Sequence, residues 1–314
     1  MFRFEISNLP EKIQKTSLYY WQAAQRQLRA YAFDYRPRAI GRPIFIVGCS
    51  RAGTTLVYKT FSESRQLASL QRESHDFWAV LHPPAARGWD SHVIPPQCAN
   101  AMDRQALARL FFVRCGRCDW IVDKNNQNGL SIPYLFELFP QAHFVFVKRN
   151  PGDNVQSLIR GWGRPEAFGS WAVELPAEVA IDDGRYRRWC FFLPPGWRAY
   201  THRPIEEVCA FQYAAMNEAI LEASARVPKA QWHEIAYETI LQDPVAAFRD
   251  LFESCGLAFD EPLQRHCREV LQRPYNAFSA IGTDKWRRSD DRRRIERVLP
   301  TLADIADRLG YRLG

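Results

Sequence analysis

The sequence predicts an α/β protein in which a central parallel sheet is flanked by helices on both faces. Ile44–Val47 is apolar at every position, as is typical of a strand covered on both sides. A second, largely apolar run spans His143–Val147. Helical patterns accompany both runs, at about 54–64, 131–139 and from 152 onward. This alternation favours a parallel sheet, whose ligands bind at the carboxyl ends of the strands.

Weaker patterns complete the predicted fold. We expect a strand at Gln231–Ile235, a helix at 205–226 and a last helix at about 290–309 that ends at Gly310. Two long stretches, 77–120 and 163–203, are rich in Pro, Gly and Trp and show little periodicity. Loops of this length in a compact domain usually bind substrate or cover it, so both are predicted to be irregular substrate-binding insertions.

The N-terminal segment 11–32 has the pattern of an amphipathic helix. Its apolar positions at helical spacing are Ile13, Leu18, Trp21, Leu28 and Tyr31, and its other face carries Lys12, Lys15, Arg26 and Arg29. We expect the apolar stripe to pack on the main domain. Peripheral contact with a membrane surface is the alternative.

The net charge and the cysteine content limit the kinds of ligand and partner that we expect. A formal charge of +7, from 42 basic and 35 acidic residues, suits an anionic ligand but lacks the clustered basic runs of a nucleic-acid-binding protein. No run approaches the ~20 apolar residues that span a bilayer, so a cytoplasmic enzyme is expected. The eight scattered cysteines, including the lone Cys115/Cys118 pair, are expected to be free thiols.

The loop after the first strand has the pattern of a phosphate-binding loop. Gly48 and Gly53 bracket four residues, as in a Walker loop, and backbone N–H groups at the start of the next helix can bind an anion. The lysine of that motif is replaced by Thr54, and the cation is Arg51 instead. The second strand leads into Arg149 rather than a magnesium-binding aspartate, so we expect an anion site that needs no metal.

A second motif follows the strand at 143–147. Arg149 at the strand end and Ser157 early in the next helix are spaced to bind one phosphate together, because the guanidinium group suits phosphate oxygens. Two phosphate sites on neighbouring strands imply a ligand with two separated phosphate-type groups.

These motifs resemble those of sulfotransferases that use 3′-phosphoadenosine 5′-phosphosulfate (PAPS). PIFIVGCSRAGTTL is similar to the 5′-phosphosulfate loop of that family, and VKRNPGDNVQSL to its 3′-phosphate motif. The arginine in the loop resembles the branch that includes bacterial and tyrosylprotein sulfotransferases. Four more stretches match in order: Gln71–His75, Val122–Asn125, Ala236–Ile240 and Thr283–Arg287.

The resemblance implies a P-loop-like three-layer fold and one domain over 1–314, with 1–41 as an N-terminal helical extension. It assigns the leaving 5′-phosphate to the loop and the sulfonate oxygens to Arg51 and Lys124. The loop residues concerned are Ser50, Arg51, Ala52, Gly53, Thr54 and Thr55. The 3′-phosphate falls to Arg149 and Ser157, closed by Lys285 or Arg287. The adenine falls to Tyr237, whose alternative role is that of a core aromatic at a strand end. Trp286 is expected to anchor its own segment.

The sequence leaves alternatives for the general base and for the acceptor. Glu73 matches the base position of the arginine-loop branch, whereas His75 has the ordinary pKa better suited to neutral pH, ~6.5; we favour Glu73. The acceptor is expected to present a hydroxyl, in preference to an amine, on a carbohydrate, lipid or other small molecule. In 163–203, tryptophans and arginines suit such a ligand but equally suit a loop packed by its own tryptophans: Trp171, Trp189, Trp197, Arg185, Arg187 and Arg188.

Two other functions remain open from the sequence alone. A small-molecule kinase of the P-loop type would require magnesium, and the missing lysine and aspartate argue against it. A non-catalytic nucleotide-binding module would keep the two phosphate sites but would not need Glu73 or His75. The sequence predicts nothing about the oligomeric state.

Overall fold

The computed structural model describes residues 9–272 and 281–313, without the side chains of 9–16, 75 and 170. Its five strands form one parallel sheet in the order β2-β3-β1-β4-β5. Their bounds are β1 Arg42–Val47, β2 Leu67–Ser69, β3 Trp120–Lys124, β4 His143–Lys148 and β5 Trp232–Ala236. The predicted α/β class is therefore confirmed, and the strands predicted at 44–47, 143–147 and 231–235 are β1, β4 and β5.

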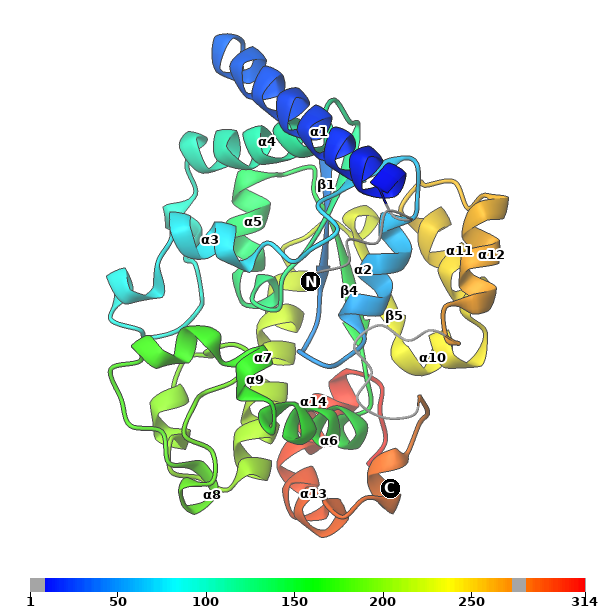
Figure 1. Cartoon of the computed structure of the whole chain (residues 1–314). Coiled ribbons are helices and arrows are strands. Elements are labelled where there is room, and N and C mark those ends of the chain that lie inside the picture. The colour runs from blue at the N-terminus through cyan, green and yellow to red at the C-terminus, as the bar shows by residue number, and fades with distance from the viewer. Residues whose placement is uncertain (1–8, 273–280, 314) are drawn as a thin grey trace, which may run out of the picture.

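Helices cover both faces of this sheet. Figure 1 shows the sheet nearly edge-on, with α2, α11 and α12 on one side and α5 and α9 on the other. The helices most relevant to the site are α2 Thr54–Ser62, α5 Ile132–Leu138, α6 Pro151–Trp162, α9 Ile205–Ser224, α10 Tyr237–Gln242, α11 Pro244–Ser254 and α12 Glu261–Glu269. The helices predicted after β1, before β4, after β4 and at 205–226 are all present.

Side-chain alternation along the central strands explains the three layers. Phe45 and Phe144 point into the core beneath α5, α6 and α9, whereas Ile44 and Val145 point into the core beneath α2, α11 and α12. Successive side chains of a strand point to opposite faces, so a strand that is apolar at every position requires cover on both.

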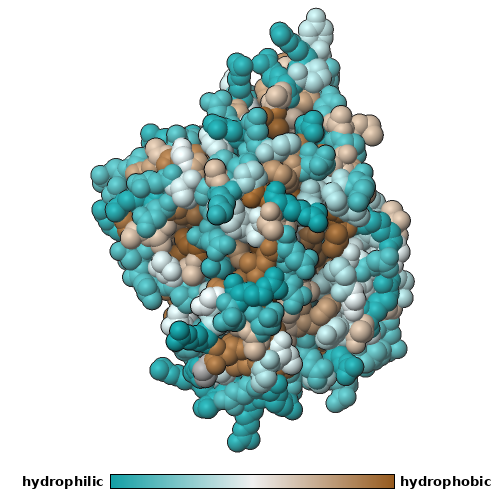
Figure 2. Space-filling view, turned by 180° about the vertical axis from the view of Figure 1, so that it is seen from behind, coloured by the Kyte–Doolittle hydropathy of each residue, from teal (hydrophilic) through white to brown (hydrophobic). Residues whose placement is uncertain are grey.

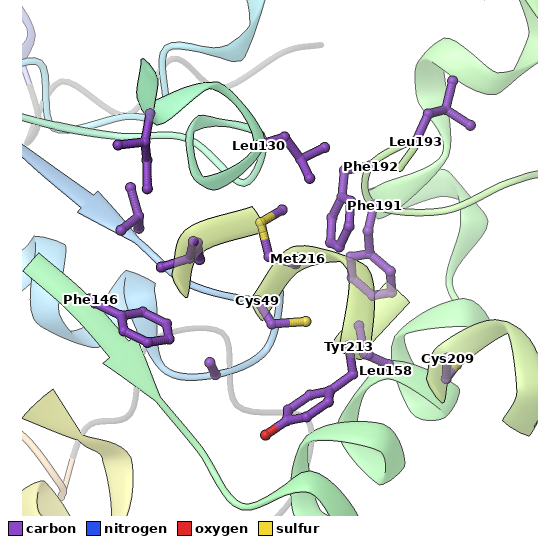
Figure 3. Packing of buried hydrophobic residues seen from close by; sticks show 14 of the residues in the cluster. Cys49, Leu130, Phe146, Leu158, Phe191, Phe192, Leu193, Cys209, Tyr213 and Met216 are labelled. Atoms are coloured by element: carbon purple, nitrogen blue, oxygen red, sulfur yellow. The ribbon is translucent and has the colours of Figure 1, made fainter. Parts of the chain in front are cut away.

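The first of these cores also forms the floor of the loop after β1. Figure 3 shows Cys49 projecting toward α9, close to Tyr213 and Met216, with Phe191 and Phe192 of the 163–203 segment nearby. Cys49 is fully buried. The loop is therefore fixed from below by packing, which leaves its backbone to face the carboxyl edge of the sheet.

Several elements differ from the expectations, among them α10, α11 and α12, for which no helix is predicted. The sequence does not predict β2, β3 or α4 (Ala101–Cys115). In α4 the exposed Met102 precedes the buried Asp103, which accepts a hydrogen bond from Tyr134 Oη at 2.8 Å. The start of the helix thus inverts the usual hydropathy pattern. Further along, Leu107, Ala108 and Phe111 are buried, but the apolar residues at 110, 112 and 113 lie outside this face and obscure its period. The prediction that 77–120 is irregular throughout is wrong for α4 and for α3, His75–Leu81.

The last predicted helix is not continuous. It consists of α13 (Arg292–Val298), a 3-10 turn at Leu299–Leu302 and α14 (Ala303–Arg308). Pro300 explains the break, because proline lacks the N–H that a continuing helix requires. Gly310, at φ 82°, ends the helix as expected, and the N–H of Tyr311 donates to the carbonyl of Ala306 at 2.8 Å.

The two insertions pack against each other. The N–H of His92 donates to the carbonyl of Leu193 at 2.8 Å, and the N–H of Leu193 donates to His92 Nδ1 at 3.0 Å. Trp197 Nε1 donates to the carbonyl of Trp89 at 2.8 Å. Segments about 100 residues apart thus form one unit beside the sheet, with short helices α7 Pro165–Phe168 and α8 Ile181–Gly184.

The N-terminal helix α1, Leu9–Tyr35, lies across the amino ends of the strands beside α4 (Figure 1). The expectation that its apolar stripe packs on the main domain is wrong for the described side chains. Leu18, Trp21, Leu28 and Tyr31 are 54%, 62%, 69% and 76% exposed. Phe33, outside that stripe, is the buried anchor instead. Across the described residues, no helix combines the length and the apolar character needed to cross a membrane.

Candidate functional site

The loop Gly48–Gly53 adopts a backbone that requires its glycines. Gly48, Arg51 and Gly53 have φ values of 155°, 70° and 104°, in the region that side-chain-bearing residues seldom occupy. A side chain at Gly53 would also clash with its neighbour, because a Cβ there would lie 2.5 Å from the Tyr237 ring. The strand end, the tight loop and the start of α2 therefore form one rigid turn.

This turn can bind an anion. Thr54 begins α2 and is buried, so the unpaired N–H groups of the first helical turn lie at the carboxyl end of β1. The Ser50 hydroxyl is buried and has no hydrogen-bond partner among the described residues. The Ser50 carbonyl accepts a hydrogen bond from Asn154 Nδ2 at 3.0 Å. Buried hydroxyls are usually satisfied, so an unpaired one beside a helix start points to a ligand.

Arg51, Arg149 and Ser157 lie together above the loop. Arg51 Nε donates to Ser157 Oγ at 3.4 Å, and Arg149 Nη1 donates to the Arg51 carbonyl at 2.7 Å. The Arg149 guanidinium lies over the Tyr237 ring at 4.4 Å from its centre. Burial, together with the charge of Arg149, lowers the pKa of Arg51 to about 10. The structure thus places two partly desolvated cations where the two predicted phosphate motifs meet.

A third cation approaches from β3. Lys124, at the strand end, is 5% exposed, and its Nζ donates to Glu73 Oε1 at 2.5 Å and to Thr55 Oγ1 at 3.3 Å. Glu73 is half-buried and lies just before α3. His75 is the first residue of α3, and its side chain is outside the described residues. Glu73, Lys124 and the loop therefore meet at one point.

The C-terminal segment is tied to the start of α6. The buried carboxylate of Asp153 accepts hydrogen bonds from the backbone N–H groups of Asp284, Lys285 and Trp286 at 2.7, 2.9 and 3.3 Å. Trp286 is buried against Gly152, where a Cβ would lie 2.4 Å from its Nε1. As expected, Trp286 anchors its segment.

This anchoring brings Lys285 to the cation cluster. Burial lowers the pKa of Lys285, and the positive charges of Arg149, Arg160 and Arg51 lower it further. Arg287 instead lies over the ring of Trp286 and bonds Asp284 Oδ1 at 3.4 Å, with its side chain 46% exposed. Of the two residues predicted to close the site, Lys285 is thus the one whose pKa responds to the charge of Arg149.

Three positioning residues were not predicted. Asp153 and Asn154 hold the C-terminal segment and the loop, and Glu238 accepts the backbone N–H of Asn150 at 2.9 Å and the Tyr311 hydroxyl at 2.8 Å. The sequence does carry a signal for Asp153 and Asn154. They follow the Asn-Pro-Gly start of α6 and lie in its first turn, where Asp is common. None existed for Glu238, whose partners are far away in the sequence.

The tryptophans of the second insertion are structural. Trp189 and Trp197 are fully buried and pack edge to face with centres 5.4 Å apart. Trp171 is partly buried and lies over Trp89 at 6.3 Å. Of the two roles that the sequence left open, packing of the loop by its own tryptophans is the correct one for Trp189 and Trp197. Within this insertion, Phe168 has its ring 5.7 Å from the Arg51 guanidinium.

The eight cysteines are free, as expected. Burial raises the pKa of the Cys118 thiol to about 11, so this thiol is not activated. Over 9–272 and 281–313, no three His, Cys, Asp or Glu side chains are grouped in a way that could hold a metal ion.

Fold and site together define a P-loop-like α/β protein in which several cationic side chains converge on a turn suited to an anion. The family model described as "Sulfotransferase family" matches residues 43–170 and 184–261. The chain belongs to this family. The matched segments contain the loop, Glu73, Lys124, the Arg149–Ser157 motif and Tyr237.

Individual relatives are distant. The omega-hydroxy-beta-dihydromenaquinone-9 sulfotransferase Stf3 of Mycobacterium tuberculosis is 22% identical over 86% of this chain and 75% of its own. Sulfotransferase STF9 from Mycobacterium avium has a similar solved structure, with TM-score 0.55, 14% identity and coverage of 92% of this chain and 83% of its own. The sulfotransferase domain from the curacin biosynthetic pathway has TM-score 0.51 and 15% identity, over 88% of this chain and all of that domain. At these identities the two solved structures support the fold alone.

Proposed function

We propose that this protein transfers the sulfonate group of PAPS to a hydroxyl group of an acceptor molecule. The observation that carries the proposal is the convergence of Arg51, Lys124, Arg149 and Lys285 from four separate segments onto one loop. Bringing like charges together in a partly desolvated site is costly unless an anion compensates them. PAPS carries anionic groups at both its 5′ and 3′ positions.

The residues present fit this donor. The N–H groups and hydroxyls of Ser50–Thr55 can hold the 5′-phosphate, and the unpaired Ser50 hydroxyl supplies a donor there. Arg149, Ser157 and Lys285 would hold the 3′-phosphate; Arg149 Nε is buried and also has no partner among the described residues. Tyr237, at the end of β5, would contact the adenine.

The expected reaction moves one group between two oxygens. The bond from the sulfonate sulfur to the bridging oxygen of the 5′-phosphate breaks, and a bond from sulfur to the acceptor oxygen forms. Arg51 and Lys124 would stabilise the negative charge that spreads over the sulfonate and bridging oxygens. The acceptor proton would pass to a carboxylate, so the atoms and charges balance.

Glu73 is our choice for that base. Its carboxylate contacts Lys124 at 2.5 Å, which places it beside the cation assigned to the sulfonate. A base must lie within hydrogen-bond reach of the acceptor proton, so geometry has priority over an ordinary pKa near neutrality. His75, two residues further at the start of α3, remains the alternative.

We infer an acceptor with a hydroxyl on a largely apolar body. Trp189 and Trp197, two of the three tryptophans that could stack on a sugar, are buried in the second insertion. Phe168, which lies beside Arg51, is an apolar alternative surface. The Stf3 relative is named as a sulfotransferase of omega-hydroxy-beta-dihydromenaquinone-9, which supports the same class. The test is a screen of hydroxylated lipids and sugars for a mass gain of one sulfonate.

The donor is tested by thermal stabilisation, because a ligand that binds the folded state raises the apparent stability. Adenosine 3′,5′-bisphosphate should raise the melting temperature, and ATP with magnesium should do so far less. A preference for ATP with magnesium would favour a kinase. Binding of the bisphosphate without turnover in the acceptor screen, unaffected by Glu73→Gln, would favour a non-catalytic module.

A further inference from the structure

The N-terminal helix is attached to the body through only part of its length. Near its C-terminal end, Arg29 Nη1 donates to the Arg114 carbonyl at 3.3 Å, Phe33 packs on Phe112 at 5.8 Å, and Asp34 pairs with Arg109 at 2.8 Å. Further toward the N-terminus, all six side chains at 17–22 are exposed. A helix packed on a protein hides one face, so this portion of α1 is not covered by the described part of the chain.

The uncovered portion is apolar and aromatic. Leu18, Tyr19, Tyr20 and Trp21 are consecutive and 54% to 67% exposed, and none of the residues 17–22 carries a charge. In the view from behind, α1 projects above the body, and its visible part carries hydrophobic residues among hydrophilic ones (Figure 2). Tyrosine and tryptophan prefer the boundary between water and hydrocarbon, because each ring has an apolar body and one polar group.

Arginines surround the place where this helix joins the body. Two neighbouring hollows at the amino ends of β1 and β3, of about 950 and 640 Å³, share Arg42, Arg117 and Asp119. Together their walls contain six arginines and one carboxylate, Asp119; the arginines are Arg36, Arg38, Arg42, Arg65, Arg114 and Arg117. Arg38 and Arg42 lie over the rings of Phe112 and Trp120, a contact that leaves their charge unneutralised.

We propose that α1 and these two hollows bind the surface of a bilayer that contains anionic lipids. The aromatic portion of α1 would insert at the headgroup level, and the arginines would contact lipid phosphates. Arg29 bonds the carbonyl of Arg114, which lines one of the hollows. Leu18 lies 11 residues before Arg29, about 16 Å along the helix axis, so the aromatic portion and the hollows can meet one surface. Each arginine near an anionic membrane surface strengthens the attraction.

Charge favours a bilayer over a second copy of this chain. In a two-fold dimer formed through this face, each copy would present the same six arginines to the other. Charged side chains are depleted from the cores of protein interfaces, whereas an anionic lipid surface complements them. The face lies at the amino ends of the strands, away from the candidate site at the carboxyl ends (Figure 1). Membrane binding and donor binding should therefore be separable.

The test is sedimentation with vesicles of phosphatidylcholine, alone or with about 30% phosphatidylglycerol. The full chain should bind the anionic vesicles, and binding should fall on raising NaCl from roughly 0.1 to 0.5 M as the charges are screened. Tyr20→Ser with Trp21→Ser, and separately Arg36→Ala with Arg38→Ala, should each lower the partition coefficient about tenfold. Stabilisation by adenosine 3′,5′-bisphosphate should be unchanged in both, which shows that they fold.

Matched controls lie elsewhere on the surface. Val80→Ser with Val173→Ser removes side chains that are 79% and 63% exposed, and Arg292→Ala with Arg293→Ala removes exposed charges from α13 at the opposite end of the molecule (Figure 1). Neither should change vesicle binding. The proposal is overturned if the chain ignores anionic vesicles, or if controls and α1 variants lose binding equally. It is also overturned if the chain is a dimer without lipid and Tyr20→Ser with Trp21→Ser makes it monomeric.

Discussion

The two ends of the sheet both carry basic residues, but in different physical states. At the carboxyl ends, Arg51, Arg149 and Lys124 are largely withdrawn from water, and the pKa of Arg51 is lowered to about 10. At the amino ends, Arg36 and Arg38 are exposed. Desolvated charges interact strongly with one well-placed anion, whereas exposed charges are screened by salt and water. The difference suggests a specific ligand at one end and a diffuse anionic surface at the other.

The largest effect is expected at the carboxyl ends of the strands, where the cations are buried. Arg51→Asn and Lys124→Met should each lower the rate of sulfonate transfer by about 10²–10³-fold, because each removes a charge assigned to the transition state. Asparagine suits the Arg51 position because it tolerates a φ of 70° better than alanine. Initial rates at saturating donor provide the measurement, and circular dichroism checks the fold. Full activity in both variants would refute the assigned roles.

The next effect compares one arginine from each end. Arg149→Ala should weaken binding of adenosine 3′,5′-bisphosphate by about 10- to 100-fold, since charge-assisted hydrogen bonds contribute roughly 1.5–3 kcal/mol. Arg65→Ala, in the wall of an amino-end hollow, should leave that affinity unchanged. The affinity of both variants for the bisphosphate is measured by calorimetric titration. Equal losses would mean that the buried cations have no special role.

A smaller effect is expected from Asp153, which acts through Lys285. Asp153→Asn removes the charge that accepts three backbone N–H groups, and we expect a roughly threefold to tenfold loss of bisphosphate affinity. Affinity for adenosine 5′-monophosphate, which lacks the 3′-phosphate, should change little. Asp290→Asn, an exposed carboxylate of the same region, is the matched control. A general structural role for Asp153 would instead weaken both nucleotides equally.

The smallest effect concerns acid stability at the amino ends. His143 Nδ1 lies 2.9 Å from His233 Nε2 with the rings stacked, and burial followed by the charge of His143 lowers the pKa of His233 to about 4. The unfolded histidine binds a proton near pH 6.5, so the unfolded state gains protons first as the pH falls. The free energy of unfolding should therefore decrease from about pH 6.5 toward 4.

This pH dependence can be assigned with one variant. His233→Gln keeps a polar partner for Ser254 Oγ, which lies 3.0 Å from His233 Nδ1, but removes one titrating group. Urea midpoints measured between pH 7 and pH 4.5 should depend less on pH in the variant than in the parent chain. An identical pH dependence in both would place the acid-sensitive groups elsewhere.

Much of the site could be predicted because its signals are local. Gly48, Gly53 and Arg51 lie in one loop, and Arg149 and Ser157 are eight positions apart at the start of one helix. In a parallel sheet, both motifs must reach the same edge once each strand is recognised. Lys124 was assigned through the family resemblance only, since β3 has no pattern that predicts it.

The sequence by itself determined the elements whose pattern repeats over a few residues: the apolar strands β1 and β4, the weaker strand β5, the glycine-bracketed loop and the ends marked by proline or glycine. Tertiary structure decided which partners met. It joined Asp153 to Lys285 across 132 positions and Lys124 to Glu73 across 51, and it buried Trp189 while leaving Trp21 exposed. The physical reason is that periodicity shows where an apolar face lies, whereas only the packed chain shows what, if anything, covers it.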